Sequence, residues 1–327
     1  MDSVCAIYKR EIFEYTLHKV MLTGTPLLSS VDSLFAQFNI LHPMKWYSHQ
    51  YFINRYCPPA SKKQKEENPA QSFVLQNLDE LKILMSECCY VVSKEEVYSH
   101  LPDVTEILVP CVIKKNTELN KQIEKLKQTI EDSTNQLEIE NMINSSRQIL
   151  GKAKIKFCVD YVNDMLCTDT DTKIVVFTHH REVTEETADL FGDKAVLFYG
   201  GMSANQKQAA LDRFLNDNQC RVIVMNSSAV TGVDSIQKKA NTCVWLELTS
   251  SSYIEEQATG RIRRINSGEW FDKFFSYFIK SDSPLDDAIL AVLEDRRNLV
   301  KAVLSGNQIT NEEKSDALEI LRKLKGQ

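Results

Sequence analysis

The chain has 327 residues, of which 43% are hydrophobic and 26% charged, and its 39 Lys and Arg against 45 Asp and Glu give a net charge of −6. This composition excludes wholesale disorder, and the length allows about two domains of ordinary size with buried cores. The mild acidity argues against bulk nucleic-acid affinity but allows a local basic groove, and scattered cysteines without a CxxC pair favour reduced, intracellular thiols.

The first half of the chain alternates between aromatic, polar and helical segments. The aromatic-rich stretch 42–59 is expected to be the core of an accessory subdomain, although its rings could also stack on bases. The polar segment 60–72 is predicted to be an exposed loop. A helix is predicted at 77–89 and a strand at 105–113. Residues 116–147 predict a helix, packed on its own domain or binding a first lobe or a protein partner.

From residue 152 onward, strands alternate regularly with helices. Five short apolar runs predict strands, at 173–177, 194–199, 221–226, 242–248 and 274–279. This alternation implies a parallel sheet covered by helices on both faces. The segment 285–305 carries an apolar stripe and predicts a helix docked on that sheet, and a last short helix is predicted to end the chain.

The segment 253–264, YIEEQATGRIRR, concentrates polar side chains suited to phosphate. A helix would align Gln257, Arg261 and Arg264 along one face, together with Gly260. Guanidinium groups are fork-shaped donors that match phosphate oxygens, although on charge alone the segment also fits a basic, solvated helix face. Its order, Q-x-x-G-R-x-x-R, resembles motif VI of superfamily 2 helicases, whose two arginines reach a nucleotide held by the other lobe.

Four further segments resemble helicase motifs, and they follow one another in the order that these proteins have. Residues 21–26, Met-Leu-Thr-Gly-Thr-Pro, resemble motif III, and residues 175–180 resemble motif IV. The segment 199–214 is similar to the G-x-[T/S] stretch and the helix that come next. Residues 222–234 resemble motif V, a strand followed by a loop of small residues.

The finer resemblance is to the Swi/Snf-like branch, and within it to the annealing-helicase (HARP-like) translocases. It rests on four short sequences, Arg-Tyr-Cys at 55–57, Asn-Leu-Asp-Glu-Leu at 77–81, Gly-Lys-Ala-Lys at 151–154 and Val-Phe-Thr-His-His at 176–180. The resemblance implies an α/β fold, a RecA-like helicase C-terminal lobe with a helical insertion and a remnant of the first lobe.

Four parts of the chain follow from this resemblance. Residues 1–45 would be the remnant of the first lobe, and 46–150 a helical accessory region. Residues 151–282 would form the C-terminal RecA-like lobe, and 283–327 a helical brace.

The resemblance also implies roles for individual residues. Arg261 and Arg264 would be the catalytic arginine fingers, stabilising charge on the transferring γ-phosphoryl group. Three residues would serve the nucleotide cleft, namely Gln257, Gly232 and Asp234. Four residues would contact DNA, namely Ser227, Ser228, Thr178 and His179. Three residues would couple the lobes, namely Thr23, Gly24 and Thr25.

The implied activity is that of the second-lobe half of a DNA-dependent ATPase or translocase of replication-fork remodelling and DNA repair. Duplex or forked DNA would be its partner, the nucleus its location, and ATP with Mg²⁺ its cofactors. Neither G-x-x-x-x-G-K-[S/T] nor Asp-Glu-x-His occurs in the sequence, and Gly151-Lys152 lacks the spacing of a phosphate loop. We therefore expect a fragment that does not hydrolyse ATP alone. The alternative is a non-catalytic DNA- or protein-binding module derived from a helicase lobe.

Overall fold

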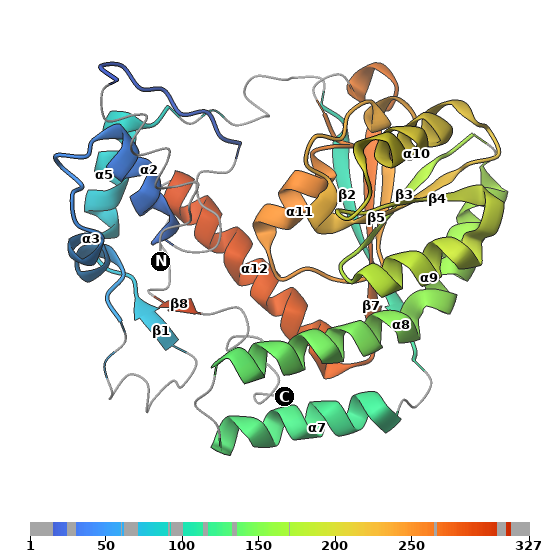
Figure 1. Ribbon diagram of the computed structural model, residues 1–327, viewed down its shortest axis with the longest axis horizontal. Coiled ribbons are helices and arrows are strands. Elements are labelled where there is room, and N and C mark those ends of the chain that lie inside the picture. The colour runs from blue at the N-terminus through green and yellow to red at the C-terminus, as the bar shows by residue number, and fades with distance from the viewer. Residues whose placement is uncertain are drawn as a thin grey trace. The chain divides into compact units, whose positions relative to one another are not determined.

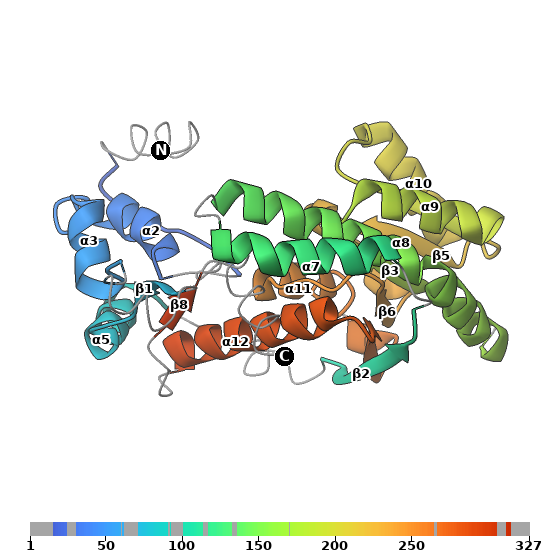
Figure 2. The ribbon, with the colours of Figure 1, turned by 90° about the horizontal axis from the view of Figure 1, so that it is seen from below.

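The structure is a computed structural model, and it describes residues 16–24, 31–59, 61, 71–90, 92, 101–113, 117–132, 136–169, 171–264, 267–305 and 312–314. The chain divides into two compact units, residues 1–91 with 294–319 and residues 92–293 with 320–327. Figures 1 and 2 show the elements of both units with their labels. No helix in the described ranges is long and apolar enough to cross a membrane.

Six parallel strands form the sheet of the second unit, in the order β2–β7–β6–β3–β5–β4. Their bounds are Asp103–Cys111 for β2, Ile174–Thr178 for β3, Ala195–Phe198 for β4, Val222–Asn226 for β5, Thr242–Trp245 for β6 and Lys273–Ser281 for β7. All six predicted strands are confirmed, and so is the parallel α/β architecture.

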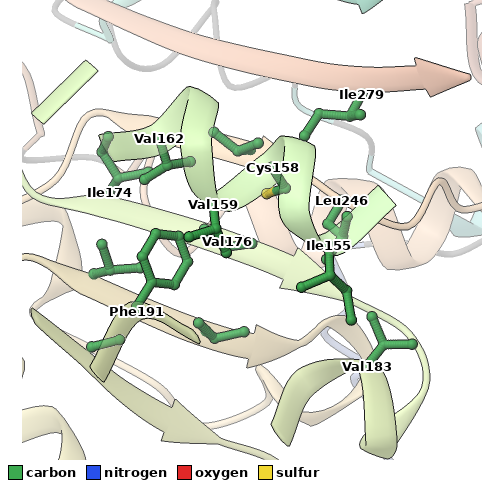
Figure 3. Close-up of a cluster of buried hydrophobic side chains, with 14 of the residues drawn as sticks. Ile155, Cys158, Val159, Val162, Ile174, Val176, Val183, Phe191, Leu246 and Ile279 are labelled. Atoms are coloured by element: carbon green, nitrogen blue, oxygen red, sulfur yellow. The ribbon is translucent and has the colours of Figure 1, made fainter. Parts of the chain in front are cut away.

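The central strands β3, β5 and β6 are buried on both faces of the sheet. Figure 3 shows the cluster on one face, where α8 (Gln136–Thr168) and α9 (Arg181–Phe191) pack on the strands. Val159 and Val162 of α8 lie in this cluster with Val176 of β3. The neighbouring residues Val175 and Phe177 are equally buried, and they point to the opposite face because side chains alternate along a strand.

Four further α-helices follow, α7 (Thr117–Asp132), α10 (Ala204–Asn216), α11 (Ser252–Thr259) and α12 (Pro284–Ser305), the last of which belongs to the first unit from residue 294 onward. Leu119 and Ile123 of α7 are buried, and α7 lies alongside α8. The single helix predicted over 116–147 is thus divided between α7 and the start of α8, and its α7 part packs within its own domain. Leu285 and Ile289 are also buried, as the apolar stripe of the predicted C-terminal helix requires.

Two features of the second unit differ from the predicted division into domains. β2 lies in the region assigned to the accessory part, yet it pairs along its whole length with β7. α8 is one continuous helix that runs through the predicted boundary at residue 150. Periodicity shows where a strand occurs but not which sheet it joins, because that choice depends on a partner far away in sequence.

The first unit is built around aromatic side chains. It contains α2 (Ser33–Leu41), α3 (His49–Tyr56) and α5 (Leu78–Cys88), with β1 (Gln71–Val74) antiparallel to β8 (Glu312–Lys314). Five rings lie in its core, Phe35, Phe38, Trp46, Phe52 and Tyr56. The core role expected for the aromatic stretch is therefore confirmed.

The prediction of an exposed loop over residues 60–72 is wrong at its end, where the chain forms β1. β1 begins at Gln71, because pairing with β8 brings two sequence-distant segments together. The short helix predicted to end the chain lies outside the described residues.

Two of the short sequences that carried the resemblance meet in the first unit. Arg55 forms an ion pair with Glu80, and the Tyr56 hydroxyl donates to Glu80 Oε1 at 2.8 Å. Asn77, which is left-handed at φ 53°, donates from Nδ2 to the Arg55 carbonyl at 2.7 Å. The Arg-Tyr-Cys and Asn-Leu-Asp-Glu-Leu segments thus contact each other, and Cys57 is fully buried.

Candidate functional site

Polar residues follow the carboxyl ends of three neighbouring strands of the sheet. His179 and His180 follow β3, a short 3₁₀ turn at Ser227–Ala229 follows β5, and Glu247 follows β6. β3 lies between β5 and β6, so these segments form one continuous edge. In parallel α/β sheets, ligand sites lie outside the carboxyl ends of the strands, which makes this edge the first place to search.

Glu247 organises the turn between β3 and α9. It is 5% exposed. Its Oε2 accepts hydrogen bonds from the backbone N–H groups of His179 at 2.7 Å and His180 at 2.8 Å, and its Oε1 lies 2.6 Å from His180 Nδ1. Burial acts to raise the pKa of Glu247, but the hydrogen bonds from His180 and the two N–H groups outweigh it and lower the pKa. The carboxylate therefore stays ionised although it is buried.

Sequence reasoning missed Glu247, and one signal could have found it. The residue is the single charge in the apolar run predicted as a strand at 242–248. Because acidic side chains are almost never fully buried unless paired, a carboxylate in such a run indicates an internal partner.

Asn226 joins the same turn to the loop after β5. Its Nδ2 donates to the His179 carbonyl, and its Oδ1 accepts from Ser228 N at 3.1 Å and from Ser228 Oγ at 2.5 Å. Ser228 is exposed, whereas Ser227 is 3% exposed. Of the two serines predicted to contact DNA, only Ser228 presents its side chain at the surface.

The other two residues predicted to contact DNA lie at the end of β3. Thr178 is fully buried, and its Oγ1 hydrogen-bonds Thr184 Oγ1 at 2.7 Å and the Met225 carbonyl at 3.3 Å. Its side chain therefore supports the edge from inside. His179 is half-buried, and its Nδ1 has no hydrogen-bond partner among the described residues. Burial, and then the charges of Arg147 and His180, lower the pKa of His179 to about 4, against the opposing effect of Glu247.

The pKa of His179 predicts a loss of stability as the pH falls. Its ordinary pKa is 6.5 and its folded pKa about 4, so between these values the unfolded chain binds more protons. The stabilising contribution is therefore complete above pH 6.5 and is lost progressively down to pH 4. We expect a loss of about 3 kcal/mol over this window, at roughly 1.4 kcal/mol per pKa unit. Urea unfolding measured across pH 4–7.5 tests this.

His179→Gln should flatten this pH dependence, while His18→Gln, at an exposed histidine of the first unit, should leave it unchanged. A His179→Gln profile that overlays the wild type would show that another group causes the effect.

The predicted arginine helix is shorter than expected. α11 begins after Ser251, whose Oγ accepts from Ile254 N, and it ends at Thr259. Gly260 is its C-cap, and Arg261 and Arg264 lie in the turns that follow. The prediction of one helical face through residue 264 is therefore wrong beyond Thr259. Glycine destabilises a helix interior, so the chain leaves the helix at Gly260.

These turns meet the loop that follows β5. Arg261 Nη1 donates to the Val233 carbonyl at 3.4 Å, and Arg264 forms an ion pair with Asp234. Gly232 has a φ of 81°, a left-handed conformation in which a side chain would be strained. The structure therefore brings both arginines together with Gly232 and Asp234, from two segments that are separate in sequence.

Asp234 is held by its own loop as well as by Arg264. Its Oδ1 accepts from Ser235 N at 2.7 Å and from Gln237 Nε2 at 3.2 Å. The Ser235 N–H, and then Gln237, lower the pKa of Asp234, with the charge of Arg264 adding to them. The Arg264 side chain is 38% exposed, so its guanidinium also faces solvent.

The remaining predicted site residues do not all lie beside Arg261 and Arg264. Gln257 is half-buried on α11, one turn before Arg261. Thr23 and Gly24 are exposed in the first unit, and Thr25 lies outside the described residues. No group of three or more His, Cys, Asp or Glu residues that could hold a metal occurs in the part of the chain that the structure covers.

Two family models match the sequence. Residues 153–266 match the model described as helicase conserved C-terminal domain, and residues 6–156 match the SNF2-related domain. The DNA annealing helicase and endonuclease ZRANB3 of Bos taurus is 24% identical over 296 residues, which are 88% of this chain and 27% of that protein. The SWI/SNF-related matrix-associated actin-dependent regulator of chromatin subfamily A-like protein 1 of Drosophila melanogaster is 21% identical over 308 residues, 91% of this chain and 39% of that protein. The chain thus spans well under half the length of these relatives.

A solved structure shares the fold. The Sulfolobus solfataricus SWI2/SNF2 ATPase core in complex with dsDNA aligns with a TM-score of 0.50 and 21% identity, covering 93% of this chain and 65% of that one. This agreement shows the RecA-like α/β fold.

Proposed function

We propose that the chain, whose sequence matches an SNF2-related domain followed by a helicase conserved C-terminal domain, is a Swi/Snf-like protein that supplies the second lobe of a DNA-dependent ATPase of the annealing-helicase type. The observation that carries this proposal is the cluster in which Arg261 and Arg264 meet Gly232 and Asp234. Fork remodelling and DNA repair, in the nucleus, are the proposed setting; the names of the relatives describe a DNA annealing helicase and a regulator of chromatin.

The arginine cluster is the proposed nucleotide-facing side. ATP with Mg²⁺ supplies the transferable phosphoryl group when bound, and a first lobe is proposed to provide most of its ligands. Arg264 is already ordered by Asp234, and exchanging that carboxylate for a phosphate oxygen keeps a charge-assisted hydrogen bond. Arg261 is ordered by the Val233 carbonyl. Gln257, on the helix that leads to both arginines, is proposed to orient the cleft.

The carboxyl edge at β3 and β5 is the proposed DNA-facing side. Ser228 presents a hydroxyl there, and His179 presents a half-buried ring. Hydroxyl and backbone contacts to phosphates position a protein on DNA but carry no sequence information, which suits a translocase. Thr178 and Ser227 are proposed to act through backbone and packing. Thr23, Gly24 and Thr25 are proposed to couple the lobes.

The test has two parts. Fluorescence anisotropy with a labelled forked duplex should show binding that weakens steeply as salt rises, because phosphate contacts release counterions. ATP turnover should be absent for the chain alone and should appear, stimulated by DNA, when a separately produced first lobe of a relative is added or fused.

Each result has a clear consequence. No DNA binding at low salt would refute the proposal, and DNA-stimulated turnover by the chain alone would refute its half-enzyme part. Salt-dependent binding with no turnover in any combination would favour a non-catalytic DNA-binding module instead.

A further inference from the structure

We propose that Glu247 is a positioning residue that holds the DNA-facing edge in shape through a network that includes His180 and Asn226. This inference rests on the proposed function, since it takes the carboxyl edge at β3 and β5 to face DNA. It concerns a residue that contacts neither proposed ligand and acts through the turn between β3 and α9.

The carboxylate of Glu247 makes three close contacts to the turn between β3 and α9. Both oxygens of Glu247 are engaged, by two backbone N–H groups and the ring of His180, all within 2.8 Å. His180 is the N-cap of α9 and provides no side-chain cap to that helix. A negative charge here is stabilised by the helix dipole and by hydrogen bonds to a charged acceptor, which are the stronger kind.

Helix α8 leaves space for this carboxylate at Gly151. A Cβ placed on Gly151 would lie 2.7 Å from Glu247 Oε1 and 2.9 Å from its Cδ. Only glycine lets the helix pass so close. Lys152, the next residue, pairs with Glu182 at 2.6 Å and Glu186 at 3.0 Å on α9. Gly151 and Lys152 lack the spacing of a phosphate loop, and their contacts show a packing role instead. Gly151 leaves room for the Glu247 side chain, and Lys152 pairs with two carboxylates of α9.

A chain of hydrogen bonds connects Glu247 with Ser228 at the surface. The carboxylate fixes the backbone of His179, Asn226 binds the His179 carbonyl, and the same Asn226 side chain binds Ser228. The exposed hydroxyl of Ser228 thus takes its position from a buried charge three contacts away. Removing that charge should misplace the edge without removing any group that touches DNA.

Glu247 also lies shortly before α11 in the sequence. Ser251, the N-cap of α11, follows it closely, and α11 leads to Arg261. Arg147 of α8 donates to the carbonyl of Leu248, directly after Glu247, at 2.9 Å. The segment that positions the DNA-facing edge is therefore also the segment that introduces the proposed nucleotide-facing arginines.

The test compares Glu247→Gln with Glu182→Gln in the full chain. Glutamine keeps the size of the side chain but loses the charge, while Glu182 is an exposed carboxylate of α9 bonded to Lys152. Hydrogen exchange should become about tenfold faster at the His179 and His180 amides in Glu247→Gln and stay unchanged in Glu182→Gln. The dissociation constant for a labelled duplex should rise about fivefold, with an unchanged salt slope because no phosphate contact is lost.

The outcomes separate the inference from the proposed function. Unchanged exchange at both amides in Glu247→Gln would show that the carboxylate does not hold the turn. Faster exchange with wild-type DNA affinity would reduce Glu247 to a structural role and overturn its positioning role. A wild-type chain that binds no DNA would refute the proposed function and the positioning role together, while the exchange data would still decide whether Glu247 holds the turn.

If Glu247→Gln does not fold, His180→Asn provides the second variant. It removes the ring that Oε1 contacts and keeps both backbone donors to Oε2. A smaller rise in the dissociation constant, in the same direction, is expected. Wild-type affinity in this folded variant would overturn the role given to His180.

Discussion

Replacing Asp286 with alanine is expected to lower the free energy of unfolding by about 3–5 kcal/mol. Asp286 and Lys154 are each only 1% exposed, and Lys154 Nζ lies 3.1 Å from Asp286 Oδ2. Asp286 also accepts from the N–H and the hydroxyl of Ser281, both at 2.7 Å. The substitution leaves an ammonium group buried with the Ile279 carbonyl as its remaining partner. Urea unfolding followed by circular dichroism measures the loss.

The next residue provides a matched control. Asp287, in the same turn of α12, pairs with Lys280 of β7, but these side chains are 36% and 33% exposed. Asp287→Ala should therefore cost no more than about 1 kcal/mol. The double variant Lys154→Met, Asp286→Leu should recover part of the stability, since it removes both buried charges. Equal losses for the two aspartates would contradict the importance given to the buried pair.

Arg261→Ala and Arg264→Ala are each expected to reduce DNA-stimulated ATP turnover about a thousandfold when a first lobe is supplied. The expectation follows from the proposed role of these guanidiniums in stabilising charge on the transferring phosphoryl group. Both are surface-facing ends of side chains bonded to one loop, so their removal should leave the lobe folded. Steady-state turnover with and without DNA measures the effect, and the unfolding midpoint confirms the fold.

Arg263 is the control within the same segment. Its Nε donates to the Pro102 carbonyl at 2.9 Å, which directs it away from Asp234 and toward the start of β2. Arg263→Ala should lower stability slightly and leave turnover within severalfold of wild type. Wild-type turnover in Arg261→Ala or Arg264→Ala would remove the assignment of these residues as arginine fingers.

The sequence predicted the strands and the order of the motifs because those signals are local. A buried parallel strand such as Ile174–Thr178 is a run of β-branched and aromatic residues, and no other part of the chain is needed to see it. The arginine cluster was predictable in membership but not in geometry. Gly260 ends α11 early, and the loop around Gly232 then supplies the partners of Arg261 and Arg264.

What the sequence could not predict depends on contacts between distant segments. Glu247 looks like an isolated charge until the turn at His179 and His180 is folded against it. Gly151 looks like a weak helix residue until the same carboxylate occupies the space beside it. The resemblance to motif IV implied a DNA contact for Thr178, but packing against α9 encloses its side chain.

The position of β2 has a consequence for how the chain folds. β2 is synthesised before every other strand of this sheet, and β7, its neighbour, is synthesised last among them. The contact therefore closes a long loop, which is the kind of pairing that slows folding. Until β7 leaves the ribosome, β2 has no partner in the sheet, and an unpaired strand is a site for association with other chains. Completion of the sheet thus waits for nearly the whole second unit, which favours folding after synthesis over folding strand by strand.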